Sequence, residues 1–283
     1  MMEPVVATGV IETLEADGIR PVFHLRADAM SYVFGVTRHG HLEHLHFGRA
    51  LPSLTASDLD AVRVKVPRAP HGVLYLADDP DYCLDLMPLE HSGLGKGDYR
   101  LPPAEIKMPD GSFVTDFTYR GHTIHDGTVA ASGGLPTAIA GEDDCQTLEV
   151  RLADGDVHLT LYYTVFPAVS CVTRRCVLTS AGDDPVVIRK LMSFCVDLPN
   201  RPFDLVTFDG ADLTEARRHQ RPVAPGTYTN SSITGFSSNR HNPGILLTTR
   251  GATEDSGEVW GFNLVYSGSH ETSVELTQRD LVR

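Results

Sequence analysis

Residues 23–51, FHLRADAMSYVFGVTRHGHLEHLHFGRAL, predict a β-hairpin around which the rest of the fold is organised. Residues 31–36, SYVFGV, are rich in aromatic and β-branched side chains, which suit a half-buried strand. Residues 38–40, RHG, supply a turn, because the glycine can adopt positive φ without steric cost. Residues 41–47 then return as the second strand.

The returning strand carries the strongest metal-like pattern in the sequence. With regular alternation, His44 and His46 share one face of the strand, and Leu45 and Phe47 share the other. Two imidazoles on one face are a partial transition-metal site, but Glu43 points to the opposite face and gives no third ligand. We therefore expect the hairpin histidines to be ordinary polar residues, and we expect neither a metal nor another cofactor.

The rest of the chain repeats short apolar or alternating runs separated by Gly, Pro, Asp and Asn, and residues 157–165, VHLTLYYTV, alternate most cleanly. Helical patterns are scarce: Ser57 is a candidate N-cap for residues 57–62, and residues 214–218 are a candidate single turn. We expect an all-β fold of large antiparallel sheets with few short helices. The expected strands are residues 5–14, 22–26, 31–37, 41–47, 62–66, 72–76, 104–107, 113–125, 146–153, 157–166, 170–179, 186–196, 205–208, 245–249, 258–266 and 273–278.

Length and charge limit the possible classes. The chain has 283 residues, and the Pro- and Gly-rich stretches 93–103 and 222–226 are too short to be linkers, so we expect one domain over residues 1–283. The net charge of −13 argues against nucleic acid or an anionic membrane as a partner, since both require a cationic surface. No apolar run approaches the ~20 residues that a membrane helix needs.

The cysteines and the N-terminus favour a cytoplasmic protein. The beginning of the chain, MMEPVVATGVIETLEADG, contains acidic residues and has no apolar core of a signal peptide. The five cysteines are odd in number, match no zinc or redox spacing, and are expected to be free thiols; they are Cys83, Cys145, Cys171, Cys176 and Cys195.

No catalytic constellation stands out among the acidic residues. Glycoside hydrolysis needs two carboxyl groups that face one substrate. Adjacent residues of a strand point to opposite faces, so the Asp-Asp pairs at 78–79, 143–144 and 183–184 are typical of turns. No Gly-x-Ser-x-Gly run is present, and residues 93–97, GLGKG, lack the spacing of a phosphate loop.

Several motifs occur in the order found in one known family. Residues 40–49 read GHLEHLHFGR, residues 97–103 read GDYRLPP, residues 134–138 read GLPTA and residues 257–268 read GEVWGFNLVYSG. With the Phe-His-Leu and Ser-Tyr-Val runs of the hairpin, this series resembles the N-terminal part of bacterial α-galactosidases of glycoside hydrolase family 36. The resemblance covers roughly residues 20–283 and implies the β-supersandwich fold of the galactose mutarotase type.

The resemblance also implies where the chemistry lies. Family members carry a nucleophile in a Lys-Trp-Asp type motif and a second Asp, both in a (β/α)8 barrel that follows the β-domain. This sequence has neither motif, and its one tryptophan is Trp260, so we expect the barrel to be absent and the chain to be inactive alone. In the family further strands precede the barrel, so we expect that the β-domain is truncated after Arg283. Asp98 and Arg100 are expected to pin their loop by a charge-assisted hydrogen bond, either with each other or across an interface.

The expected function is therefore that of a non-catalytic domain. In the complete enzyme, a retaining glycosidase for terminal α-galactosides such as melibiose and raffinose, it would serve assembly of a homo-oligomer and the rim of a neighbouring active site. By resemblance, Asp78 and Asp79 are the candidate substrate-binding residues, through a hydrogen bond to a sugar hydroxyl. The alternatives are a stand-alone carbohydrate-binding module and a mutarotase-like module, which would need a His pair and a Glu on one sheet face.

Overall fold

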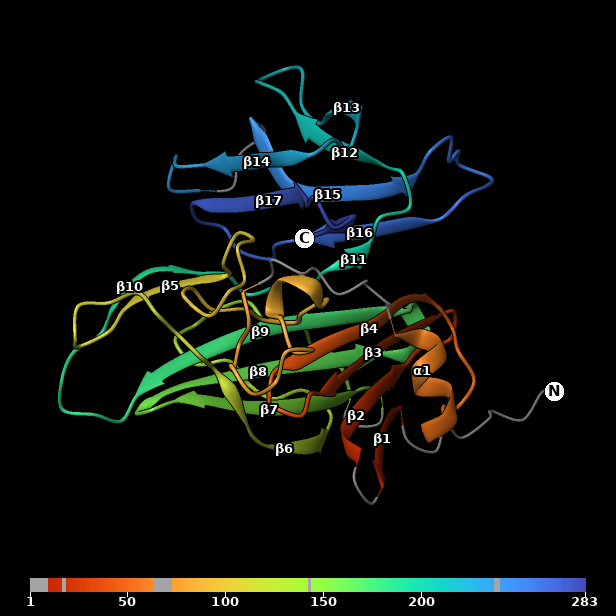
Figure 1. The fold of residues 1–283 in the computed structure, drawn as a ribbon. Coiled ribbons are helices and arrows are strands. Elements are labelled where there is room, and N and C mark those ends of the chain that lie inside the picture. The colour runs from red at the N-terminus through yellow and green to blue at the C-terminus, as the bar shows by residue number, and fades with distance from the viewer. Residues whose placement is uncertain (1–9, 17–18, 64–72, 142–143, 237–239) are drawn as a thin grey trace. The chain divides into compact units, whose positions relative to one another are not determined.

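A computed structural model describes residues 10–16, 19–63, 73–141, 144–236 and 240–283 (Figure 1). The expected all-β class is confirmed: the described residues form antiparallel sheets, and their single α-helix, α1, has four residues. The chain divides into two compact units. Unit 1 comprises residues 1–130 and 138–198, and unit 2 comprises residues 131–137 and 199–283. The single domain expected over residues 1–283 stays a prediction, and each unit is described by itself.

The first sheet of unit 1 contains the hairpin that opened the sequence. Its strands are β1 (Ile11–Ala16), β2 (Ile19–Arg26), β3 (Met30–Val36) and β4 (Leu42–Arg49), and they lie in this order with antiparallel pairing. The short helices η1 (Ala56–Asp58) and α1 (Leu59–Val62) pack on one face of the sheet through an apolar cluster of Leu59, Val22, Val33 and Leu45. The helix expected here exists as these two short helices, whose N-cap residues are Thr55 and Asp58 in place of Ser57.

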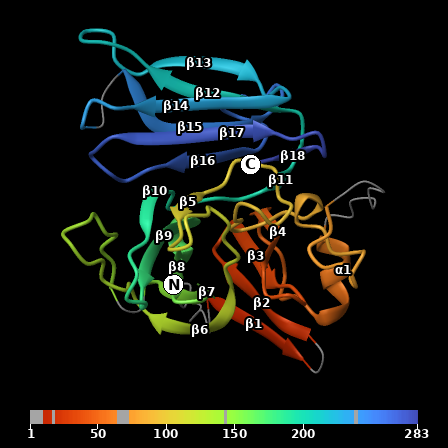
Figure 2. The same ribbon diagram turned by 60° about the vertical axis from the view of Figure 1, so that its left-hand side comes forward.

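The second sheet of unit 1 comes from a later part of the chain. Its order is β6 (Thr118–Asp126), β7 (Gln146–Asp154), β8 (Val157–Phe166) and β9 (Cys171–Ser180). A separate pair joins β5 (Ala104–Lys107) to β10 (Val187–Leu191). The first and second sheets lie side by side in both ribbon views (Figure 2). Phe34 of β3 stacks on Tyr163 of β8 with ring centroids 4.7 Å apart, so aromatic side chains fill the space between these two sheets.

One expectation about the hairpin is wrong, and a β-bulge is the reason. Val33 pairs with His46, whereas the next residue, Phe34, pairs with His44, so Leu45 is an extra residue in β4. Paired residues share a sheet face and successive residues of β3 alternate, so the bulge places His44 and His46 on opposite faces. Leu45 therefore joins His46 on the α1 face.

Unit 2 is built from two sheets. One has the order β13 (Arg217–Pro222), β12 (Phe203–Asp209), β15 (His241–Thr249) and β16 (Val259–Asn263). The other has the order β11 (Leu198–Pro199), β18 (Leu281–Val282), β17 (His270–Leu276) and β14 (Gly226–Ser232). The helical turn expected at residues 214–218 is wrong, because residues 217–222 form an edge strand that pairs with β12. The sequence RRHQRP has no alternation of apolar and polar residues. Its pairing with β12, and not its own hydrophobic pattern, makes this segment a strand.

Some expected strands fall partly outside the described residues, namely residues 5–9 of the first, residues 64–66 of the fifth and residue 72 of the sixth. Val62 belongs to α1, and residues 73–76 contain only an isolated bridge between Leu76 and Asp79. The remaining short helices are η2 (Leu84–Leu86) and η4 (Pro167–Val169).

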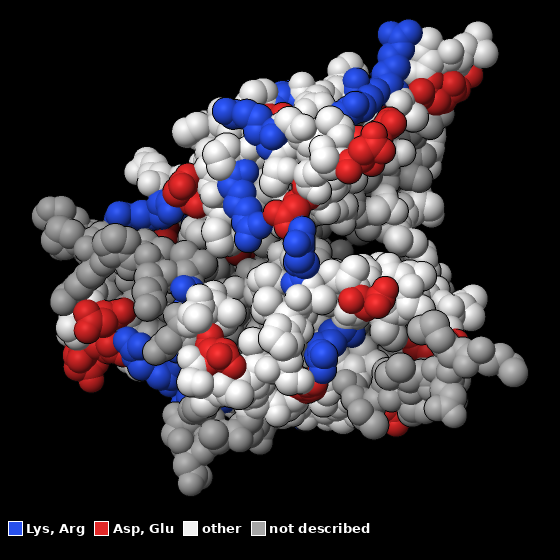
Figure 3. All heavy atoms as spheres, turned by 90° about the vertical axis from the view of Figure 1, so that its right-hand side faces the viewer, with Lys and Arg blue, Asp and Glu red and all other residues white. Residues whose placement is uncertain are grey.

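The described surface carries both signs of charge. On the face that Figure 3 draws, acidic and basic side chains alternate in small groups, and neither sign gathers into one wide field. Within the described ranges, no helix combines the length and the apolar character that crossing a membrane requires.

Candidate functional site

The turn of the first hairpin positions the candidate site. The backbone N–H of Thr37 donates to the carbonyl of His41 at 2.8 Å, and Gly40 takes a φ of +90°, as the turn prediction required. The carbonyl of Gly40 accepts the N–H of Tyr119 at 2.8 Å. A Cβ at Gly40 would lie only 3.2 Å from the Cβ of Thr118, so glycine also permits this close approach. Contacts with Thr118 and Tyr119 of β6 thus fix the turn.

Asp79, one of the two candidate substrate-binding residues, lies against this turn. Arg38 donates to its carboxylate through Nε at 2.6 Å and Nη2 at 2.8 Å, and His39 Nε2 lies 2.7 Å from Oδ2. These hydrogen bonds, with that of Arg38 the strongest, hold the pKa of Asp79 well below its ordinary value. The side chain keeps 22% of its surface exposed, so the ionised carboxylate faces water beside a cation.

Asp78 occupies a different environment. The N–H of Asp79 donates to the carbonyl of Leu76 at 3.3 Å, which places Asp78 at a central position of a tight turn. Asp78 is exposed. The structure therefore brings Asp78 and Asp79 to one surface turn but gives them unequal partners, since only the carboxylate of Asp79 is held by Arg38.

A hydrogen-bonded series continues inward from the turn to Asp116. His41 Nε2 lies 2.9 Å from Asp116 Oδ1 and donates to it, because an ionised carboxylate only accepts; His41 Nδ1 lies 2.7 Å from the Tyr82 hydroxyl. Tyr75 donates to Asp116 Oδ2 at 2.8 Å. Burial alone would raise the pKa of Asp116, but the hydrogen bonds from His41 and Tyr75 outweigh it and lower the pKa to about 2. Burial and the bond to Asp116 raise the pKa of Tyr75 to about 12.

The pocket beside this series is small. His41, His91, Lys96 and Asp116 are among its lining residues, and Lys96 Nζ lies 3.4 Å from Asp116 Oδ2. Among the described residues of the lining, Asp116 is the one that carries a carboxyl group. Retaining and inverting glycosidases both need a pair of carboxyl groups across the scissile bond, so this pocket cannot perform that chemistry by itself.

The hairpin histidines do not converge. His39 is bound to Asp79 and His41 to Asp116, and His44 Nδ1 lies 2.6 Å from Glu90 Oε1. His46 Nε2 lies 3.0 Å from the carbonyl of Arg49. Among the residues that the structure describes, no group of three or more His, Cys, Asp or Glu side chains is placed to hold a metal ion.

The most enclosed carboxyl group is Glu90, which is fully buried between the two sheets of unit 1. The hydroxyl of Tyr32 lies 2.9 and 2.8 Å from its two oxygens, and Tyr163 donates to Oε2 at 2.9 Å. Arg174 donates to Oε2 at 3.3 Å and to the Glu90 carbonyl at 2.6 Å. Burial raises the pKa values of both tyrosines well above their ordinary range, so both stay protonated donors. With its 0% exposure, Glu90 is closed to any substrate.

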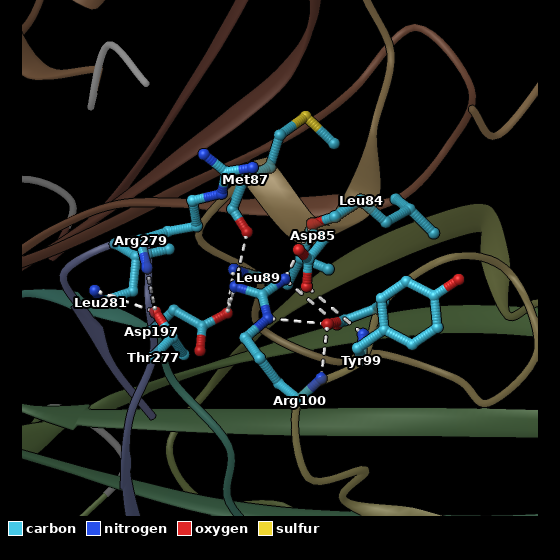
Figure 4. A network of polar contacts seen from close by, with 11 residues as sticks. Leu84, Asp85, Met87, Leu89, Tyr99, Arg100, Asp197, Thr277, Arg279 and Leu281 are labelled. Atoms are coloured by element: carbon cyan, nitrogen blue, oxygen red, sulfur yellow. Dashed lines mark hydrogen bonds and ion pairs between the residues drawn. The ribbon is translucent and has the colours of Figure 1, made fainter. Parts of the chain in front are cut away.

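A second buried ion pair confirms a prediction from the sequence. Arg100 donates to Asp98 from Nε at 2.7 Å and from Nη2 at 3.1 Å, as expected for a loop pin. Its Nη1 also donates to Asp197 at 2.8 Å and to the carbonyl of Met87 at 2.9 Å, and its Nη2 donates to the carbonyl of Leu84 at 2.8 Å (Figure 4). All five donors of the guanidinium are thus used, and the loop from residue 84 to residue 100 closes on itself.

Sequence reasoning missed the roles of Glu90, His41 and Asp116. The residues that contact Glu90 lie 46 to 84 positions away in the chain, so no local spacing marks it. One sign in the sequence was the number of His and Tyr residues in and after the hairpin. Buried imidazole and hydroxyl groups need hydrogen-bond partners, and carboxylates can supply them.

Comparison with known proteins agrees with this all-β architecture. Residues 40–283 match the family described as Glycosyl hydrolase family 36 N-terminal domain. The chain belongs to this family. It is 33% identical over 270 residues to α-galactosidase 1 of Pediococcus pentosaceus, covering 94% of this chain and 36% of that relative.

Solved structures of family 36 agree. The α-galactosidase AgaB of Geobacillus stearothermophilus matches with a TM-score of 0.87 and 30% identity, over 96% of this chain and 36% of that one. A variant of AgaA from the same organism, solved in complex with raffinose, matches with a TM-score of 0.87 and 30% identity, over 92% of this chain and 36% of that one. The family 36 chain thus spans 36% of the length of these α-galactosidases and corresponds to their non-catalytic N-terminal part.

Proposed function

We propose that this family 36 chain acts as the N-terminal domain of a retaining α-galactosidase that hydrolyses terminal α-galactosides such as melibiose and raffinose. The observation that carries the proposal is the match of residues 40–283 to the family's N-terminal domain. Because retaining hydrolysis needs two carboxyl groups about 5 Å apart, bond cleavage would belong to other parts of such an enzyme.

The proposed contribution of the chain is assembly and the rim of a neighbouring active site. Asp78 and Asp79 are the proposed substrate contacts, through hydrogen bonds to sugar hydroxyls. Asp79 Oδ2 already accepts from Arg38 and His39, whereas among the described residues Oδ1 accepts from Arg38 alone, so Oδ1 retains a lone pair for a ligand. Asp78 is exposed and keeps its whole carboxylate available. A homo-oligomer in the cytoplasm is part of the same proposal.

The test uses the purified chain and a synthetic α-galactoside. We expect no release of the aglycone by the chain alone, with a complete family 36 α-galactosidase as the positive control. In a complete enzyme that carries this domain, changing both Asp78 and Asp79 to Ala should raise KM, since the acceptor oxygens are then lost. An unchanged KM would remove the two residues from the proposed site.

The mutarotase-like alternative would need a His pair and a Glu on one sheet face. The partly exposed contact of Glu149 with His125, 3.1 Å apart, supplies one imidazole. Glu90 and His44 are adjacent, as that chemistry would require, but both side chains are at most 2% exposed. The direct check is polarimetry of freshly dissolved α-galactose, for which we expect the buffer rate with and without the chain.

A further inference from the structure

Three connections of unit 2 emerge at one end of its sheets. Asp209 at the end of β12 pairs with both Arg217 and His241, the first residues of β13 and β15. Ser232 at the end of β14 pairs with His270 at the start of β17. Gly244, near the start of β15, pairs with the last residue of β16. The described residues of three connections, 210–216, 233–236 with 240, and 264–269, therefore lie at the same end of these strands, as Figure 2 shows for the two sheets of this unit.

This end of the strands, which we call the loop end, carries most of the exposed large apolar side chains among the described residues of unit 2. Its exposed side chains, with their exposed fractions, are Leu213 (89%), Ile233 (92%), Phe236 (60%), Val265 (67%) and Tyr266 (45%). The other exposed large apolar side chains among the described residues of unit 2 are Leu135 and Val259. Apolar side chains gathered at one edge mark a binding surface more often than scattered ones do.

The loop end also presents oriented polar groups. Asp209 Oδ1 lies 3.0 Å from His241 Nδ1, and Oδ2 lies 3.9 Å from His219 Nε2. Both imidazoles are half exposed, whereas the carboxylate is 22% exposed. An oriented carboxylate between two exposed imidazoles offers acceptors and donors to a ligand that carries several hydroxyl groups.

The aromatic ring of Tyr266 lies directly against Gly268. A Cβ at Gly268 would lie 2.3 Å from Cε1 of Tyr266 and 2.6 Å from its hydroxyl oxygen, so the ring packs where any side chain would stand. The N–H of Gly235 donates to Ser269 Oγ at 3.2 Å, which ties the loop that carries Phe236 to the loop that carries Tyr266. The two aromatic rings therefore belong to connected loops.

We propose that the loop end of unit 2 binds a neutral oligosaccharide, with Phe236 and Tyr266 contacting the apolar face of a pyranose ring and Asp209 and His241 contacting its hydroxyl groups. Ligand sites of this kind combine aromatic surface with a few oriented polar groups. The choice of an α-galactoside as the oligosaccharide rests on the proposed function. The residues of the loop end belong to unit 2, whereas Asp78 and Asp79 belong to unit 1.

The test is isothermal titration of the complete chain with melibiose, raffinose and maltose. We expect saturable binding of the two galactosides, weakened about fivefold or more by Phe236→Ala and by Tyr266→Ala. Gly268→Ala should weaken binding similarly, because it displaces the tyrosine ring without removing it. Tyr99→Ala, which removes an exposed ring of unit 1, is the matched control and should leave the affinity unchanged. Unchanged fluorescence of Trp260, a buried residue of β16, checks that unit 2 stays folded in each variant.

The outcomes separate the site from the proposed function. Binding of maltose in place of galactosides, with the same loss in the variants, would support the surface and contradict the galactoside specificity. No saturable binding, or binding that the loop-end variants leave unchanged, would overturn the proposal. Self-association of the chain that Phe236→Ala and Tyr266→Ala abolish, without sugar binding, would also overturn it and assign the loop end to protein contact.

Discussion

Two clusters of unit 1 use the same side-chain types and differ in their contact with water. The carboxylate of Glu90 meets Tyr32, Tyr163 and Arg174 at 0% exposure, whereas the carboxylate of Asp79 meets Arg38 at 22% exposure. A charge that is fully removed from water depends on every partner, but a charge at the surface keeps solvent as a substitute. The first cluster is therefore structural, and the second is the one that remains open to a ligand.

The largest effect should come from separating the buried charges. Arg174→Leu leaves the Glu90 carboxylate in the core without its cation, and Arg174 also lies over the rings of Tyr163 and Phe194. We expect a loss of about 3–5 kcal/mol in the free energy of unfolding, measured by urea denaturation with circular dichroism. A loss below about 1 kcal/mol, the range of a surface ion pair, would remove the contrast between the clusters.

Arg100→Lys should be the next most destabilising change, although it keeps the charge. Arg100 uses all five donors on Asp98, Asp197 and two carbonyls, and an ammonium has only three donors in a different geometry. We expect a loss of about 2–3 kcal/mol in the same unfolding measurement. Arg38→Lys, at the exposed turn, is the matched control, and equal losses for the two variants would contradict the account.

The half-buried Asp116 should show its effect as a function of pH. Its pKa falls from 3.8 to about 2 on folding, so its stabilisation is present above pH 3.8 and is lost as the pH falls through about 2. This amounts to about 2 kcal/mol at neutral pH. Asp116→Asn should therefore flatten the pH dependence of the unfolding free energy between pH 4 and pH 2. An unchanged slope would show that other carboxyl groups dominate there.

The smallest effect on stability should follow Asp79→Asn. The carboxylate is solvated, so loss of its bonds to Arg38 and His39 is compensated by water. We expect the midpoint of thermal unfolding to stay close to that of the unmodified chain, measured by differential scanning calorimetry. A shift as large as that of Arg174→Leu would place Asp79 in the structural class.

The sequence predicted those parts of the fold in which local pattern and tertiary pairing agree. The alternation of residues 157–166 predicted β8 with its observed bounds, and residues 104–107 did the same for β5. Pattern failed at Leu45, where a bulge shifts the faces, and at residues 217–222, where pairing with β12 makes a strand from polar residues. In both places pairing with the neighbouring strand determines the conformation. This pairing cannot be predicted from the hydrophobic periodicity of the segment itself.

The site was less accessible to prediction than the fold. The pin between Asp98 and Arg100 was predicted because the two residues are close in sequence and belong to a family motif. Glu90 gave no such sign, because its partners come from β3, β4, β8 and β9. The roles of isolated acidic residues depend on burial, which only the packed sheets reveal.

Galactose release by the highly purified chain is the most direct test of the claim that its acidic groups serve structure and not bond cleavage. We predict a rate with melibiose that cannot be distinguished from the buffer blank, for the unmodified chain and for Glu90→Gln alike. Hydrolysis by the unmodified chain that Glu90→Gln abolishes, while the variant stays folded, would contradict the account.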